Sequence, residues 1–126
     1  MNRELESLVT QFITLPMVLK IFKRDRETFS DWKMRNVYWD KLDAAMGSAQ
    51  EDLNEVKRSM YAEHHIRVLP LKPQDGIYPY QWKTPNEEGY VKFTSDELRD
   101  LTRNAMRYYL QNTPPRPPGA DDRAWY

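Results

Sequence analysis

The side chains best suited to acid–base chemistry or metal binding gather at Glu63, His64 and His65, and the last two are the only histidines of the chain. Neighbouring residues on a helix project in different directions, whereas helical metal sites use i, i+3 or i, i+4 spacing. The spacing therefore predicts two ordinary histidines at a junction between helix and strand. A metal held between two copies of the chain is the one arrangement left open.

Carboxylates crowd the segment 40–63, where pairs one turn apart have the spacing to bind a metal or to act as acid and base. They alternate with apolar residues, which favours a solvated polar face of a helix. A basic stretch precedes them at residues 20–35, so we expect charges to pair within the chain or across a dimer. The carboxylates are Asp40, Asp43, Glu51, Asp52, Glu55 and Glu63.

Motifs for nucleophilic catalysis and nucleotide binding are absent from the sequence. The chain has no cysteine, no Gly-x-Ser-x-Gly motif and only 4 glycines, which are scattered. A nucleophile elbow or a phosphate-binding loop needs glycines at fixed, close spacing. We therefore expect no catalytic residue, no cofactor and no metal, and a protein that is not an enzyme.

An alternating aromatic row, Tyr78, Tyr80 and Trp82, occupies one face of a predicted strand. Two interpretations are open. We favour a row that fills the core under the helices, because a small mixed domain needs large side chains there. The alternative is an exposed platform beside basic residues, a combination that binds single-stranded nucleic acid. The basic residues are Arg67, Lys83 and Lys92.

The segment 113–126 reads TPPRPPGADDRAWY. Its prolines favour an extended polyproline conformation, which docks readily in aromatic-lined grooves. It either packs on its own domain or a symmetry partner, or it serves as a docking peptide for another protein. The predicted partner-binding residues are Pro114, Pro115, Pro117, Pro118, Trp125 and Tyr126.

Two helices are predicted to precede the strands, each with apolar residues at alternating spacings of three and four. The first is interrupted by Pro16, which predicts a kink or a division into two short helices. The second runs over residues 31–63, capped by Thr28 or Ser30. We favour an antiparallel hairpin over an intermolecular coiled coil. The stripes are Leu5, Leu8, Phe12, Leu15, Leu19 and Phe22, then Trp39, Leu42, Met46, Ala49, Leu53, Val56 and Met60.

Three short β-rich segments follow, at residues 66–71, 77–83 and 90–94, and predict an antiparallel meander. Pro70 and Pro79 favour sheet edges or bulges, because proline cannot donate to a ladder. Residues 94–97 fit a capping box for a last helix that ends near residue 112. Its apolar face is Leu98, Leu101, Ala105 and Tyr108 or Tyr109. Its opposite face carries Arg99, Arg103 and Arg107, which Asp96 and Asp100 are placed to neutralise.

The whole chain has 126 residues and equal numbers of acidic and basic side chains, 19 of each. We expect one α+β domain over residues 1–112, with a helical hairpin, a small sheet and a last helix, and then the extended Pro-rich tail 113–126. The apolar run 12–22 is too short to span a bilayer. The predicted function is therefore a cytoplasmic, non-enzymatic protein-interaction or regulatory module that forms a homodimer. The alternative is a nucleic-acid-binding protein.

Overall fold

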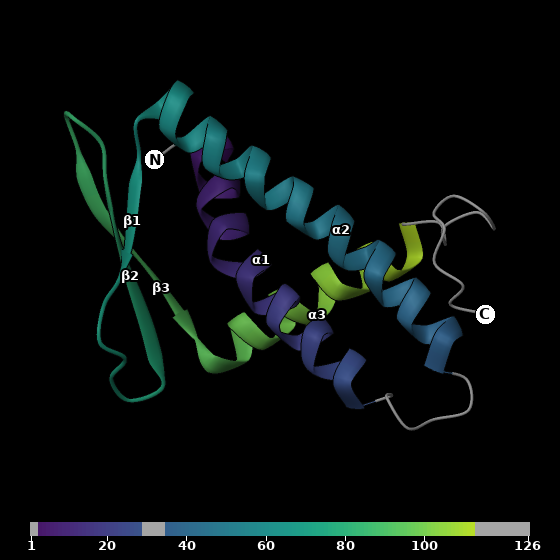
Figure 1. The fold of residues 1–126 in the computed structure, drawn as a ribbon. Coiled ribbons are helices and arrows are strands. Elements are labelled where there is room, and N and C mark those ends of the chain that lie inside the picture. Colours follow the sequence, from purple (N-terminus) through teal and green to yellow (C-terminus); the bar gives the residue numbers. More distant parts are fainter. Residues whose placement is uncertain (1–2, 29–34, 113–126) are drawn as a thin grey trace.

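A computed structural model describes residues 3–28 and 35–112, and it has the expected α+β architecture (Figure 1). Two long helices come first, a three-stranded antiparallel sheet follows, and a third helix ends the described chain. The elements are α1 (Arg3–Thr28), α2 (Arg35–Ser59), the π-helix η2 (Met60–His64), β1 (Arg67–Pro70), β2 (Ile77–Lys83), β3 (Glu88–Thr94) and α3 (Ser95–Asn112).

The helices α1 and α2 form the expected antiparallel hairpin within one chain (Figure 1). The predicted stripe of α2 is its buried face, with Leu42, Ala49, Leu53 and Val56 each no more than 6% exposed. Apolar contact of this kind is the main source of helix stability in a folded domain.

The buried face of α1 differs from the predicted stripe. Leu8, Phe12 and Leu19 are only half-buried, because α1 contacts α3 as well as α2 and must bury side chains toward both. Its buried residues are Val9, Ile13, Thr14, Leu15, Val18 and Phe22. Pro16 does not divide the helix. It lies on the exposed side of α1, where water can satisfy the carbonyl that its missing N–H leaves unpaired.

The second helix is shorter than predicted and ends in an unexpected way. The regular α-helix stops at Ser59, and one π-helical turn carries the chain to His64. His65 then adopts a left-handed conformation, with φ of 53°, and its N–H caps the Met60 carbonyl. The predicted start at residues 31–34 and the caps Thr28 or Ser30 are not tested, because residues 29–34 lie outside the described part of the chain.

One cation joins the two helices near the connection between them, at the end of α1 and the start of α2. Arg26 on α1 makes an ion pair with Asp43 on α2, with 2.8 Å between Nε and Oδ1. Its guanidinium also lies 4.4 Å from the centre of the Trp39 ring, and the Trp39 indole N–H donates to the Arg26 carbonyl at 2.6 Å. Part of the predicted charge pairing therefore occurs within the chain. Asp40, which was expected on a solvated face, is instead buried at 7% exposure.

The sheet has the order β1-β2-β3, with consecutive strands antiparallel. The prediction favoured an edge or a bulge for Pro79, yet this residue lies in the central strand. Its carbonyl accepts a hydrogen bond from the Leu71 N–H at 3.0 Å, but it has no N–H to return one. The β1–β2 ladder consequently ends at Pro70, one residue earlier than expected. β3 begins at Glu88, two residues earlier than expected.

The aromatic row is part of the core. Trp82 is 8% exposed, and Tyr78 and Tyr80 are half-buried against the core cluster. Trp82 lies opposite Gly89 on β3, and a Cβ at Gly89 would come within 2.5 Å of the indole ring. The close packing of the indole thus requires glycine at this position.

The capping box at the start of α3 is confirmed. The Thr94 N–H donates to Glu97 Oε1 at 3.0 Å, and the Glu97 N–H donates to Thr94 Oγ1 at 3.1 Å. Leu98 and Tyr109 are buried as predicted, whereas Tyr108 is 57% exposed. The helix ends at Asn112, as predicted, and the tail lies outside the described residues.

Candidate functional site

An apolar groove lies between α1 and α3, with a volume of about 880 Å³. Tyr78 from the sheet also lines the groove, so the helical hairpin, the sheet and α3 all contribute to it. Its floor is formed by thioether and aliphatic side chains, which adapt their shape readily to an apolar surface. The floor residues are Met17, Ile21, Leu98, Met106 and Leu110.

Basic side chains line the same groove, and no carboxylate among the described residues does. They come from both helices: Lys20 and Arg24 from α1, and Arg99, Arg103 and Arg107 from α3. Because residues three to four apart lie on one face of a helix, each helix brings its bases and its apolar side chains to the groove together. We call these five residues the basic rim.

Two members of the basic rim already have ionic partners. Arg99 pairs with Asp96 at 3.3 Å and Arg103 pairs with Asp100 at 3.6 Å, as the sequence predicted. In the described part of the chain, Lys20, Arg24 and Arg107 take part in no ion pair. An anionic group of a bound molecule could therefore pair with each of these three side chains.

The sequence revealed only half of this site. It showed the α3 arginines as one stripe, but it assigned that stripe to a solvated surface. No local pattern indicated that α1 would lie beside α3, because the two segments are far apart in the chain. The available signal was the i, i+4 pair Lys20 and Arg24 flanking Ile21, and it had no meaning until the two helices were placed together.

The structure separates the six candidate nucleic-acid-binding residues onto two faces of the sheet. Tyr78, Tyr80 and Trp82 occupy the inner face. In the register of the sheet, Arg67 lies opposite Lys83 and Lys92 lies opposite Pro79. All three bases therefore lie on the face away from the aromatic row. They are exposed there, near the 59%-exposed Tyr90. The aromatic row and the bases therefore do not form one platform.

The predicted docking residues Pro114, Pro115, Pro117, Pro118, Trp125 and Tyr126 lie outside the described residues. Their role stays a prediction.

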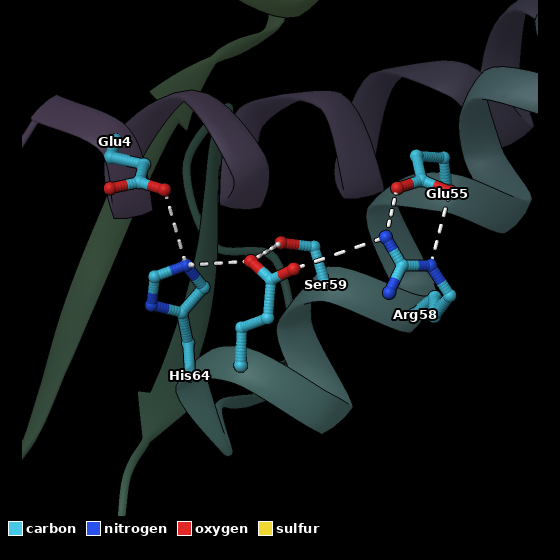
Figure 2. A network of polar contacts seen from close by, with 6 residues as sticks. Glu4, Glu55, Arg58, Ser59 and His64 are labelled. Carbon is cyan, nitrogen blue, oxygen red and sulfur yellow. Dashed lines mark hydrogen bonds and ion pairs between the residues drawn. The ribbon is translucent and has the colours of Figure 1, made fainter.

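A polar junction, which the sequence did not reveal, joins the start of α1 to the end of α2. Glu4 from the first turn of α1 faces His64 from η2, with 3.4 Å between the Glu4 carboxylate and His64 Nε2 (Figure 2). Glu63 approaches the same nitrogen at 3.9 Å. Spacing along the sequence relates only residues that are close in the chain, so it could not indicate that Glu4 lies beside His64.

A partly buried hydrogen bond connects α3 to α2. The Tyr109 hydroxyl donates to Asp52 Oδ2 at 2.6 Å. Burial, and then the hydrogen bond to Asp52, raise the pKa of the Tyr109 hydroxyl well above its ordinary value. The hydroxyl therefore stays a donor at physiological pH, and the pair is a structural contact.

By length and composition, α1 satisfies the requirements of a membrane-crossing helix. It is the one helix in the described ranges 3–28 and 35–112 that does so. The prediction considered only the apolar-rich stretch 12–22, whereas the helix that meets these requirements is 26 residues long. Buried core helices and signal sequences have the same length and composition. Six residues of α1 are buried against the rest of the domain, including Val18 and Phe22, both at 0% exposure.

Comparisons with known proteins give a family but no solved fold. The uncharacterized protein YhjD of Bacillus subtilis (strain 168) is 22% identical over 112 residues, which cover 87% of this chain and 92% of the relative. No solved structure matches the chain significantly. The model of the YhjD protein family matches residues 1–114. This chain belongs to the YhjD protein family.

Proposed function

We propose that the protein is a non-enzymatic protein-interaction module whose α1–α3 groove receives an acidic amphipathic helix of a partner protein. The observation that carries this proposal is the pairing of an apolar floor with the basic rim. We also propose a cytoplasmic location, which the absence of cysteine supports.

The shape of the groove favours a helical occupant. Its α3 wall runs from Ser95 to Leu110, which at 1.5 Å per residue is about 22 Å, or roughly four helical turns. Two neighbouring helices present a groove into which the ridge of a third helix packs. In helix-in-groove docking, the incoming helix binds through apolar side chains at positions i, i+3, i+4 and i+7.

The charge of the groove selects among amphipathic helices. Lys20, Arg24 and Arg107 have no ionic partner within the described residues, so acidic side chains beside the apolar stripe of the partner gain contacts. A basic partner would place like charges together, which costs free energy and suppresses the wrong complex. Complementary charge also speeds the encounter, and salt screens that effect.

The chemistry of the lining supports binding over catalysis. Among the described residues that line the groove, the polar groups are hydroxyls and cations, and none is a carboxylate or an imidazole. A general base with a pKa near neutrality is what most hydrolytic mechanisms need. The floor and the basic rim instead match the composition of a recognition surface.

The test uses two synthetic helical peptides with the same leucine stripe, one flanked by glutamates and the other by lysines. We expect the acidic peptide to bind the full-length protein in fluorescence anisotropy, and the lysine peptide to bind at least tenfold more weakly. The double substitution Arg24→Glu with Arg107→Glu should reverse this preference. Equal affinity for the two peptides would contradict the proposal.

A charge-matched control is Lys23→Glu with Lys83→Glu, because both lysines are exposed and neither lines the groove. This control should leave acidic-peptide affinity within about threefold of the original, the change expected from long-range electrostatics alone. The same loss in control and groove variants would show that net charge, and not the groove, determines binding.

The Pro-rich tail is a separate part of the proposed function. Deletion of residues 113–126 should leave acidic-peptide binding at the groove unchanged, and should remove binding to any aromatic-lined groove that recognises the PPRPP sequence. An SH3-type domain array probed with both forms of the protein measures that difference. If both forms give the same pattern, the tail does not dock in this way.

A further inference from the structure

Three potential metal ligands meet where the start of α1 contacts the end of α2. One oxygen of Glu4, one oxygen of Glu63 and a ring nitrogen of His64 all lie within 4.8 Å of one another. Figure 2 shows the Glu4 carboxylate and the His64 ring pointing toward each other from two different helices. A helix of 26 residues and a second segment some 60 positions later supply the ligands.

The π-helical turn is the element that brings Glu63 and His64 to this place. Neighbouring residues on a helix diverge, and this was the reason to expect no metal at the pair. Here the side chain of Glu63 turns back, so that its Oε2 lies 3.9 Å from His64 Nε2 and accepts a hydrogen bond from Ser59 Oγ at 3.0 Å. Single π-helical turns occur frequently at functional sites.

The hydrogen bond from Ser59 also fixes the carboxylate that faces His64. Metal-binding carboxylates are commonly held by hydrogen bonds of this kind from neighbouring side chains. Arg58 approaches the other oxygen of Glu63, Oε1, at 3.9 Å. The two oxygens therefore have different partners, and Oε2 is the one turned toward the histidine (Figure 2 shows Arg58, Ser59 and His64).

A second observation concerns His64 itself. Its Nε2 is buried and has no hydrogen-bond partner among the described residues, although two carboxylates lie close to it. Buried polar atoms in proteins nearly always have a partner, so an unpaired one requires an explanation. An imidazole nitrogen with a free lone pair and two facing carboxylate oxygens is a donor set for a cation.

We propose that Glu4, Glu63 and His64 bind one divalent transition-metal ion, with Zn²⁺ preferred. A tetrahedral ion with bonds of about 2.0–2.1 Å places its ligand atoms about 3.3–3.4 Å apart. The separation of 3.4 Å between Glu4 and His64 meets this requirement. The separation between Glu63 and the same nitrogen, 3.9 Å, exceeds this requirement by about half an ångström.

The donor set determines which ions fit. One nitrogen and two oxygens suit Zn²⁺ or Mn²⁺, whereas Mg²⁺ and Ca²⁺ prefer oxygen ligands alone. Zn²⁺ binds a given site more tightly than Mn²⁺ in the general order of stability. The bound ion would fasten the first turn of α1 to the end of α2 and so close the hairpin, and water would complete its coordination.

The experiment is a calorimetric titration of the full-length, tag-free protein with zinc sulfate at pH 7.5. We expect one Zn²⁺ per chain, a rise in the melting temperature with added Zn²⁺, weaker binding of Mn²⁺ and no heat from Mg²⁺. Glu4→Gln and His64→Gln should each weaken Zn²⁺ binding at least tenfold. Because Glu4 is an exposed side chain, its amide variant tests the site without loss of the fold.

Matched controls are available beside two of the proposed ligands. Glu6→Gln removes an exposed carboxylate two residues from Glu4, and His65→Asn removes the neighbouring histidine while keeping a residue that tolerates its left-handed backbone. Both should bind Zn²⁺ within twofold of the original protein. A loss with His65→Asn equal to that with His64→Gln would overturn the proposal in favour of a surface histidine pair.

Two further outcomes would also overturn it. A ratio of one Zn²⁺ to two chains would indicate an ion held between copies of the protein. If Zn²⁺ produces no heat and no thermal shift, while Glu4→Gln alone lowers the melting temperature, the cluster is an ion pair between a protonated His64 and its carboxylates.

Discussion

The hydrogen bond between Tyr109 and Asp52 leads to a prediction at the scale of single residues. Tyr109→Phe removes the donor but keeps the ring, and leaves a half-buried carboxylate without its partner. Hydrogen bonds to charged groups contribute about 1.5–3 kcal/mol. We expect the variant to lose about 1–2 kcal/mol of unfolding free energy in urea denaturation. Tyr108→Phe is the matched control, because that ring is 57% exposed, and it should lose less than about 0.5 kcal/mol.

The same residue gives the expected pH dependence. Burial raises the pKa of the Tyr109 hydroxyl in the folded state above its value in the unfolded chain, which is about 10. The contribution to stability is therefore complete below pH 10 or so and declines as the pH rises above it, because the unfolded state then loses its proton first. Tyr109→Phe should flatten the alkaline part of the stability profile. An unchanged slope there would contradict the assigned hydrogen bond.

Sequence predicted some residue-level contacts accurately and missed others, for a physical reason. The mutual bonds of Thr94 and Glu97 and the ion pairs of Arg99 and Arg103 were predictable because they join residues three apart at the start of α3 or within it. The contact between Glu4 and His64 was not, because tertiary packing brings these residues together. The burial of Asp40 was missed for the same reason.

At the scale of elements, the start of α3 offers a direct test. Thr94→Ala removes the hydroxyl that accepts from the Glu97 N–H, and should lower the unfolding free energy by about 1 kcal/mol. Ser95→Ala removes the neighbouring hydroxyl, and should change the free energy by less than about 0.5 kcal/mol. Chemical denaturation followed by circular dichroism measures both. Equal losses would show that the capping box does not stabilise the helix.

The number and order of the elements were predictable, whereas some buried faces and strand ends were not. Most of the apolar stripe of α2 is buried against the rest of the domain, although Met46 is only partly buried. The stripe of α1 fails because a second helix, α3, contacts another side of it. β2 has its predicted bounds, whereas β1 is shortened by the missing N–H of Pro79 in the neighbouring strand.

At the scale of the whole molecule, a homodimer needs a surface other than the apolar stripe of α2, because most of that stripe is buried within the domain. Exposed apolar side chains lie around the edge strand β1, where Tyr61 is 66% exposed and Leu69 is 52% exposed. They line a second hollow, of about 520 Å³, that also includes Phe12. Exposed apolar clusters of this kind mark association surfaces. We expect sedimentation velocity to show a dimer.

The variant that tests this surface is Tyr61→Glu with Leu69→Glu. It should sediment as a monomer with an unchanged circular dichroism spectrum, because neither side chain belongs to the buried core. Tyr108→Glu, on the exposed part of α3, is the control and should remain dimeric. If the unmodified protein is monomeric at every concentration, the homodimer prediction is wrong.

The contact between α1 and α3 also governs the order in which the domain assembles. The hairpin and the meander join segments that are close in sequence, whereas Thr102 meets Met17 across 85 positions. Closing so long a loop costs more entropy than forming a local turn, and long-range contacts generally form slowly. The groove consequently exists only in a chain that has completed folding. During synthesis, a nascent chain that has not yet released α3 has no groove, so a partner that binds there distinguishes finished molecules from unfinished ones.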